Sequence, residues 1–288
     1  LSRSTLPGLS LRWLLPIASG VSLLLALVSL HYGQATWNLI QAYQNQPDSS
    51  LSMPARFRPG TIVQLGQALL AFETPLPFLG LGLLGLGVVA LLVYPRKVFA
   101  LLSILLSLAL GFILSAHWDK VLLFFQAVPF DRTDPLFGRD DGFYIFSLPV
   151  WELLEFWLGG LFLVGLLAVA LVYLLAGDSL SSGRFMGFSW RQRRHLCWLG
   201  SGVLLLVALG YWLGRFELLY STRGVTYGAG FTDVRMNLPV YTLLSFLSLA
   251  IAVFWGWQAL TTTPRNKPRS PVVAVNRWWR SGNVLILA

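Results

Sequence analysis

Four aspartates and two arginines lie close together in residues 131–141, between two long apolar stretches of the chain. Carboxylate oxygens at this density suit Ca²⁺, but the segment lacks the alternating ligand positions and the distant glutamate of an EF-hand loop. Arginine–carboxylate pairs order a loop without any ligand. We therefore interpret the segment as a structural clasp or partner site, with a cation site and a catalytic site as alternatives.

A second polar segment, residues 221–239, carries the same mixture of arginine and aspartate ahead of an apolar stretch. If the two segments share one end of the molecule, Arg139 can pair with Asp140 or with Asp233 and join them. No metal ion is predicted. The residues of the predicted clasp or partner site are Asp134, Arg139, Asp140, Asp141, Arg223, Asp233 and Arg235.

Histidines are the side chains in this sequence best suited to hold a cofactor. His31 and His117 fall at the same end of two predicted helices, where imidazoles can ligate haem or chlorophyll axially. Histidines at this depth are commonly only polar end residues. No cofactor is therefore predicted, and haem or chlorophyll ligation by these two residues stays an alternative.

Charged residues are missing from the centres of the predicted helices, where proton relays and ion pathways place them. Glu152 and Glu155 come nearest to a centre, one turn inside a predicted helix. Because the dipole of a helix favours carboxylates near its N-terminus, we interpret both as capping residues, with a proton port as the alternative. No Ser–His–Asp set, metalloprotease motif or phosphate-binding loop occurs in the sequence, and the chain is predicted not to be an enzyme.

The composition determines the class of protein that must position these residues. The chain has 288 residues, of which 56% are hydrophobic and 11% charged, where soluble domains carry about 25% charged residues. Its mean hydropathy is +0.67. We predict an all-α polytopic membrane protein forming a single transmembrane domain over residues 1–288. A single cysteine, Cys197, excludes an internal disulfide.

A helix needs about 20 apolar residues to cross the hydrocarbon core of a bilayer. The first such stretch follows basic residues, as in a signal peptide, but it is long enough to span and is interpreted as a retained helix. A short apolar run at residues 283–288 predicts the start of a seventh helix. The six predicted spans are residues 12–31, 75–94, 98–116, 150–176, 196–213 and 239–260.

Proline and glycine mark particular places in these spans. Pro77, Pro149 and Pro239 each begin a returning helix, where the missing N–H of proline has no partner to lose. This is common in membrane helices, and an internal repeat of three helical hairpins is the alternative. The glycines of residues 79–87 formally match a dinucleotide-binding fingerprint, but inside an apolar span they indicate close helix packing instead.

The distribution of charge predicts the orientation. With a cytoplasmic N-terminus, the inner segments hold thirteen basic residues and one acidic residue, and the outer loops hold eight basic and eleven acidic residues. This follows the positive-inside rule. The outer loops are then residues 32–74, 117–149 and 214–238, and residues 118–128 form an amphipathic segment in the outer interface. Anionic lipid explains the basic surplus, so no nucleic-acid partner is predicted.

The two polar segments also carry a family resemblance. The sequence DPLFGRDDGFYIFSLP, taken with GAGFTD at residues 228–233, resembles an uncharacterised bacterial integral-membrane family of actinobacteria and cyanobacteria. Its motifs are D-P-x-F-G-R-D and G-A-G-Y-T-D, and Phe231 stands here where the second motif has tyrosine. The resemblance implies a seven-helix membrane domain followed by a large extracytoplasmic domain, which this chain lacks. It implies no activity.

Three functions follow as hypotheses. The first is a non-enzymatic docking or assembly subunit of a membrane complex, with the lipid bilayer and other membrane proteins as partners. The second is a transporter or lipid-handling protein whose polar path lies between hairpins. The third is a haem- or chlorophyll-associated subunit. The expected location is the bacterial inner (plasma) membrane, or the thylakoid membrane if the source is cyanobacterial.

Overall fold

The computed structural model is a bundle of long helices, which confirms the predicted all-α membrane fold. Within the residues that the structure describes, five helices are long and apolar enough to cross a membrane: Trp13–Asn45, Lys97–Ala116, Phe143–Leu174, Trp190–Tyr220 and Asp233–Thr261. The predicted seventh helix lies outside the described residues. The structure describes residues 9–45, 52–58, 60–61, 63–64, 67, 76–175, 184–185, 187–221 and 228–261.

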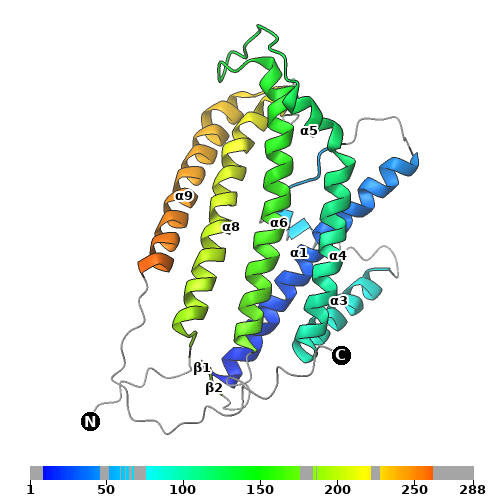
Figure 1. Ribbon diagram of the computed structural model, residues 1–288, viewed down its shortest axis with the longest axis vertical. Helices are drawn as coiled ribbons and strands as arrows, with labels where there is room; N and C mark the ends of the chain where they lie inside the picture. Colours follow the sequence, from blue (N-terminus) through cyan, green and yellow to red (C-terminus); the bar gives the residue numbers. More distant parts are fainter. Residues whose placement is uncertain are drawn as a thin grey trace, which may run out of the picture.

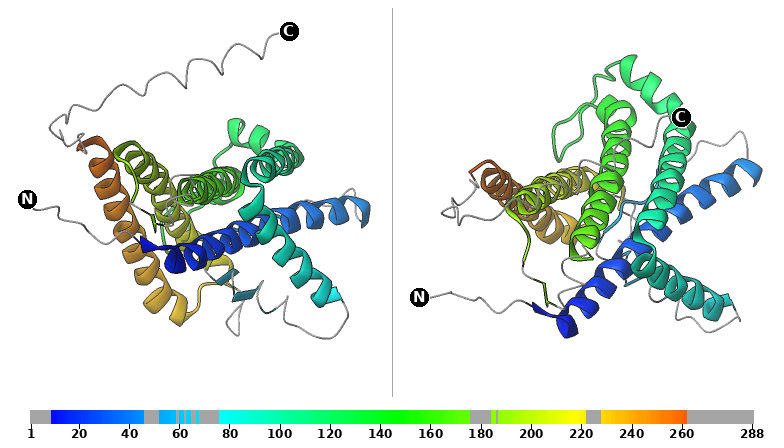
Figure 2. Two further views of the ribbon diagram at one scale, coloured as in Figure 1. Left: turned by 90° about the horizontal axis from the view of Figure 1, so that it is seen from below. Right: turned by 60° about the horizontal axis from the view of Figure 1, so that its bottom comes forward.

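The helices form two groups that meet along α1. Helix α6 (Leu148–Leu174), α8 (Trp190–Glu217) and α9 (Leu238–Thr261) stand in a row, and α8 packs mainly against its two neighbours. Helix α1 (Leu11–Asn45) crosses the bundle obliquely and contacts α6. Helices α3 (Leu76–Val93) and α4 (Pro95–Ala116) form the second group; both contact α1, and α4 also contacts α6 (Figures 1 and 2).

The main core lies where α1, α4 and α6 meet. It contains Val28 and Tyr32 of α1, Ile113 of α4, and Leu153 and Phe156 of α6, all buried. Helix α1 continues well beyond the predicted span of residues 12–31. Counting apolar residues finds only the part of a helix that lies in the hydrocarbon core. The backbone hydrogen bonds of α1 continue beyond that part, through a last third that is polar.

The short α5 (Trp118–Phe125) follows α4 and leads into the loop of residues 126–142. We call the end of the bundle that carries this loop the Asp134 end. At the opposite end, the strands β1 (Leu9–Ser10) and β2 (Arg184–Phe185) form an antiparallel pair in which Leu9 lies opposite Phe185. This pair joins the beginning of α1 to the segment that follows α6.

Helices α6 and α9 begin in the same unusual way. Each is preceded by one turn of π-helix, η1 (Phe143–Ser147) and η3 (Asp233–Asn237), in which the amide of Leu148 or Leu238 bonds to a carbonyl five residues earlier. A proline follows directly in both cases and removes the next backbone donor. Pro149 and Pro239 thus fall in the first turns of α6 and α9, as predicted, although a π turn directly precedes each helix.

Glycines allow close helix packing in one group of helices and not in the other. A Cβ added at Gly160 would meet the ring of Tyr32, and one added at Gly202 would meet the ring of Phe162. Around Gly82 and Gly85 of α3 there is open space. The prediction that the glycine-rich stretch packs closely is thus wrong at these two positions, and the close approaches lie between α6, α8 and their neighbours.

Candidate functional site

A cluster of charged side chains is buried between α6 and α8 near the Asp134 end. Its centre is Arg56, whose side chain is only 7% exposed. Arg56 Nη2 lies 3.1 Å from Glu152 Oε1 and 2.9 Å from Glu217 Oε1, and Arg56 Nε lies 3.1 Å from Glu155 Oε2. Arg56 Nη1 donates a hydrogen bond of 3.0 Å to the carbonyl of Gly210. One guanidinium thus joins two helices through three carboxylates.

A second arginine of the same segment extends this ion cluster. Arg58 Nη2 donates to Glu217 Oε2 at 2.8 Å. Burial lowers the pKa of Arg58, but the neighbouring Glu217 carboxylate outweighs it, and the net direction is upward. Three carboxylates then face two guanidiniums. Arg56 and Arg58 alone leave one of the three carboxylates unmatched, and Lys120 acts electrostatically on Glu152 as a further cation.

Glu152 and Glu155 therefore do not cap a helix. No side chain caps the first turn of α6, and the preceding π turn places both glutamates well inside a continuous helix. Their partner is an arginine from a loop, which a membrane-buried carboxylate needs because an unpaired charge there is costly. The interpretation of these two residues as capping residues is wrong.

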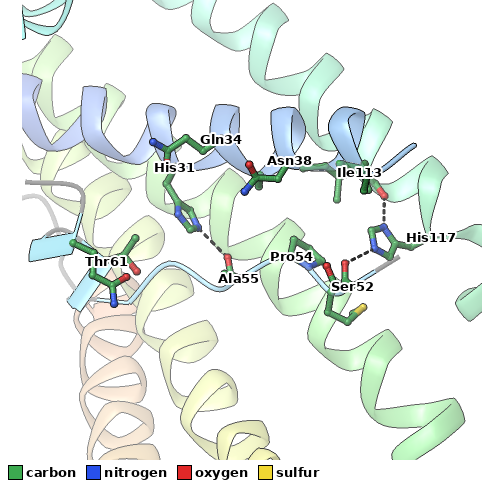
Figure 3. Close-up of a pocket in the computed structure, with 14 residues that line it drawn as sticks. His31, Gln34, Asn38, Ser52, Pro54, Ala55, Thr61, Ile113 and His117 are labelled. Atoms are coloured by element: carbon green, nitrogen blue, oxygen red, sulfur yellow. Dashed lines mark hydrogen bonds between the residues drawn. The ribbon is translucent and has the colours of Figure 1, made fainter. Parts of the chain in front are cut away.

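Both histidines proposed as cofactor ligands hold the segment that carries Arg56. The Nε2 atom of His31 lies 3.0 Å from the carbonyl oxygen of Ala55. The Nδ1 atom of His117 lies 2.8 Å from the carbonyl of Ile113, and its Nε2 atom lies 3.3 Å from that of Ser52. Figure 3 shows these contacts from α1 and α4. A haem or chlorophyll bound through Nε2 would displace the carbonyl of Ala55 from His31 and that of Ser52 from His117.

The segment of residues 52–58 also forms one wall of a polar cavity of about 510 Å³. From α1 the cavity is lined by His31, Gln34 and Asn38, which project toward the segment in Figure 3. Thr61 and Gln64 add further hydrogen-bonding groups. The described lining holds no carboxylate, lysine or arginine, so its chemistry is that of neutral donors and acceptors.

Three smaller cavities adjoin on the other side of this wall. The first cavity, of about 140 Å³, is lined by Arg56, Arg58 and Glu155. The second cavity, of about 180 Å³, shares Arg58 and Tyr241 with the first. The third, of about 50 Å³, shares Glu155 with the first and reaches Val203 of α8. The ion cluster thus has open space on two sides, although these cavities do not cross the bundle.

The loop of residues 126–142 is ordered by carboxylates that accept from the backbone. Asp134 Oδ1 accepts from the amides of Leu136 (2.8 Å) and Phe137 (2.7 Å). Asp134 Oδ2 accepts from the amide of Arg139 (3.1 Å) and the hydroxyl of Tyr144 (2.6 Å). Partial burial raises the pKa of Asp134, but these hydrogen bonds outweigh burial and lower it overall.

Asp140 plays the same part at the other end of this loop. Its Oδ1 atom accepts from the amides of Phe130 (3.1 Å) and Gly142 (2.7 Å), and these backbone hydrogen bonds lower its pKa. A Cβ on Gly142 would lie 2.7 Å from that same oxygen, so the contact requires glycine. Gly138, with φ of 63°, allows the turn between the two aspartates.

One of the two arginines of the loop pairs with an aspartate as predicted, and among the described residues the other does not. Arg132 and Asp141 lie 3.6 Å apart, and the Arg132 side chain is 85% exposed. The guanidinium of Arg139 lies 5.3 Å from the centre of the Phe143 ring and has no carboxylate partner in the described part of the chain. The expected pairing of Arg139 with Asp140 or Asp233 is therefore not observed.

The second polar segment also uses its aspartate internally. Asp233 is buried and accepts from the amide of Gly230 (3.1 Å) and the side chain of Asn237 (2.8 Å), across the π turn η3. Arg235 lies over the ring of Phe231, 5.9 Å from its centre. Arg223 lies outside the described residues. The predicted site residues thus order their own loops, and the buried ion cluster forms elsewhere.

Comparisons with known proteins place the chain among proteins of unassigned function. The model of an uncharacterised protein family, UPF0182, matches residues 13–285. A UPF0182 protein of Nostoc sp. is 47% identical over 87% of this chain, which covers 24% of the relative. One from Trichodesmium erythraeum is 42% identical over 88% of the chain and 24% of the relative. No solved structure matches. The chain thus spans about a quarter of the length of these relatives.

Proposed function

The chain is a member of the UPF0182 family, and we propose that its membrane domain binds and handles a polar ligand, as a transporter or lipid-handling protein does. The observation that carries this proposal is the cavity of about 510 Å³ between α1, α4 and the segment of residues 52–58. Ligand sites typically have volumes of about 300–1,000 Å³ and a few converging polar groups.

The lining of this cavity indicates the chemistry of the ligand. Amides at Gln34, Asn38 and Gln64, with the hydroxyl of Thr61, offer both donors and acceptors without a formal charge. Such a set suits a neutral group rich in hydroxyls or amides, such as a sugar. In this proposal the cavity lies at the level of the lipid headgroups, because His31 and His117 mark the predicted outer ends of two spans. A sugar-bearing lipid headgroup therefore satisfies both the chemistry and the position.

The ion cluster has a separate part in this proposal. Arg56 holds the cavity wall against α6 and α8, while His31 and His117 hold it against α1 and α4. The unmatched carboxylate of the cluster suits a proton or a small cation, as in ion-coupled transport. In this proposal the Asp134 end faces the outside of the inner or thylakoid membrane, as the positive-inside rule indicates.

A ligand-binding experiment tests the proposal. The purified chain in mild detergent is titrated with a short-chain neutral glycolipid and with the matching diacylglycerol, and adducts are counted by native mass spectrometry. We expect selective binding of the glycolipid, weakened about tenfold by Asn38→Leu because hydrogen bonds to the headgroup are lost. The control Gln41→Leu changes an exposed residue of α1 that does not line the cavity. Equal binding of the two lipids would contradict the proposal.

A docking or assembly role is the second candidate, and the length of the relatives favours it. The chain spans about a quarter of them, so a membrane domain of this kind supports a much longer protein. The Asp134 end presents exposed aromatic side chains, including Phe125 and Phe231. Gentle extraction followed by native mass spectrometry addresses this role. A strictly monomeric protein without partners would count against it.

A further inference from the structure

Arg215 is a charged residue that neither the ion cluster nor the polar cavity uses. It lies in the last turn of α8, with its guanidinium 4.2 Å from the centre of the Trp212 ring and 5.7 Å from that of Phe137. Its Nε atom is buried and has no hydrogen-bond partner, and no carboxylate pairs with Arg215 among the residues described. A cation in a membrane helix normally has such a partner.

This guanidinium is oriented without being neutralised. Aromatic rings hold it through cation–π attraction, which leaves its N–H groups available along the edge. The N–H groups of Arg56 and Arg58, in contrast, bond to carboxylates. A planar guanidinium with a free edge matches the oxygens of a phosphate group, which it binds with two parallel hydrogen bonds.

Arg139 adds a second cation to the same aromatic cluster. Its guanidinium lies over Phe143, and the ring of Phe143 lies 5.1 Å from that of Phe216. Phe216 in turn lies 4.9 Å from Phe137, the ring beneath Arg215. Two arginines without carboxylate partners in the described chain thus flank one continuous group of rings, which favours an anionic ligand over a neutral one.

The location of Arg215 separates it from the proposed ligand cavity. Gly210, Gly214 and Glu217 form the face of α8 toward Arg56 and Arg58. Arg215 instead contacts Phe137 of the loop of residues 126–142. Trp212 is 39% exposed, and tryptophans are enriched at membrane interfaces, where lipid phosphates also lie.

We propose that Arg215, held between Trp212 and Phe137, binds the phosphate group of a phosphate-bearing ligand at the Asp134 end of the bundle, with Arg139 as a second positive charge on the same aromatic cluster. The two sources of such a group are a phospholipid headgroup and a soluble phosphorylated molecule. The site is independent of the proposed glycolipid cavity, since the two share no residue.

Native mass spectrometry of the full chain tests this inference. The probes are short-chain phosphatidylglycerol, the matching diacylglycerol and inorganic phosphate. We expect the chain to retain phosphatidylglycerol in preference to diacylglycerol, and Arg215→Gln to weaken that binding about tenfold or more, because charge-assisted hydrogen bonds are lost. The control Arg132→Gln removes a nearby exposed arginine and should bind as the unchanged chain does.

A competition measurement with inorganic phosphate distinguishes the two sources of the phosphate group. Displacement of phosphatidylglycerol by millimolar inorganic phosphate would indicate a soluble ligand, and its failure would indicate a lipid held also by its acyl chains. Arg215→Lys keeps the charge but removes the planar fork. We expect it to fold with an unchanged unfolding midpoint in lipid-free detergent and to bind more weakly.

Two outcomes would overturn the inference. One is equal phosphatidylglycerol binding by the unchanged chain, Arg215→Gln and Arg215→Lys. The other is a large loss of stability in Arg215→Lys without lipid, which would assign Arg215 a structural role. Binding of the neutral glycolipid should remain unchanged in both Arg215 variants, so failure of this inference and failure of the proposed ligand cavity are distinguishable.

Discussion

The ion cluster around Arg56 and the loop of residues 126–142 use the same residue types in opposite ways. In the cluster, carboxylates pair with guanidiniums, and the Arg56 side chain is 7% exposed. In the loop, Asp134 and Asp140 accept from backbone amides, and Arg139 lies on an aromatic ring. The most deeply buried guanidinium thus pairs with carboxylates, whereas backbone amides are the main partners of the aspartates that order the exposed turn.

This difference has a physical reason. In a loop near water, the unpaired groups that must be satisfied are backbone amides, since arginine side chains can reach solvent. Inside the bundle, helices satisfy their own backbone, and the groups that need partners are the glutamate carboxylates. In each region, the ionic side chains therefore bond to the polar groups that the local fold leaves without partners.

The largest expected effect comes from removing the centre of the ion cluster. Arg56→Met leaves Glu152, Glu155 and Glu217 facing one another, with Arg58 as the remaining arginine of the cluster. Breaking a buried pair in this way costs about 3–5 kcal/mol. We expect the free energy of unfolding, measured by denaturing-detergent titration in mixed micelles, to fall by that amount. The matched control is Arg132→Met, whose arginine is 85% exposed and should change stability by about 0–1 kcal/mol.

Equal stability of the two variants would show that the cluster is not a buried ionic centre. The triple variant that adds Glu152→Gln and Glu155→Gln sharpens the comparison, because it removes the carboxylates that Arg56→Met leaves unpaired. We expect it to recover part of the lost stability. Further loss would mean that the carboxylates have other essential partners.

The helices of this bundle could be predicted from the sequence, whereas the ion cluster could not. Apolar length alone predicts a membrane helix, since nothing but a helix satisfies its own backbone in lipid. The partner of Glu152 and Glu155 lies far away in sequence, in a loop that returns among the helices. One signal was present: two carboxylates in a membrane helix require a cation, and Arg56 and Arg58 are the basic residues of the predicted loop 32–74.

A smaller effect is expected in the loop, from Asp134→Ala. This change removes the acceptor for three backbone amides and for the Tyr144 hydroxyl. Loss of hydrogen bonds to a charged group costs about 1.5–3 kcal/mol. We expect the loop to become sensitive to protease between residues 131 and 142, while Arg56→Met should expose residues 52–58 first. Cleavage at the same place in both variants would contradict the expectation that the loop and the ion cluster unfold independently of each other.

The pH dependence of the loop follows from the same contacts. Hydrogen bonds hold the pKa of Asp134 and of Asp140 below the usual value of an aspartate, about 3.9. Since the folded-state pKa is lowered, their stabilisation is complete above that value and is lost as pH falls through the lowered pKa. Protease access to the loop should therefore rise only under strongly acidic conditions. In Asp134→Asn this dependence should weaken, which pH-stepped proteolysis by an acid-stable protease measures.

The residues of the loop were found from the sequence, but their contacts were not. A dense group of aspartates, arginines and glycines predicts an ordered turn, because such residues fix turns through local hydrogen bonds. Opposite charges close together in the sequence also predict ion pairs, and this prediction is wrong for Arg139. The conformation of the turn decides whether an arginine side chain lies next to a carboxylate or next to a ring. Here the ring of Phe143 lies beneath Arg139.

The smallest effect is therefore expected from Arg139→Ala. A buried pair with Asp140 or Asp233 would have made this change costly, but Arg139 is exposed, its guanidinium lies over a ring face, and its backbone bonds to Asp134. An exposed cation–π contact contributes about 0.5–1 kcal/mol, and the amide contact survives the substitution. Thermal unfolding in lipid-free detergent should thus show a change no larger than that of Arg132→Ala. If Arg139→Ala instead destabilised the chain as strongly as Arg56→Met, the two regions would not divide their charges as described, and the arginine would have a carboxylate partner in the intact protein.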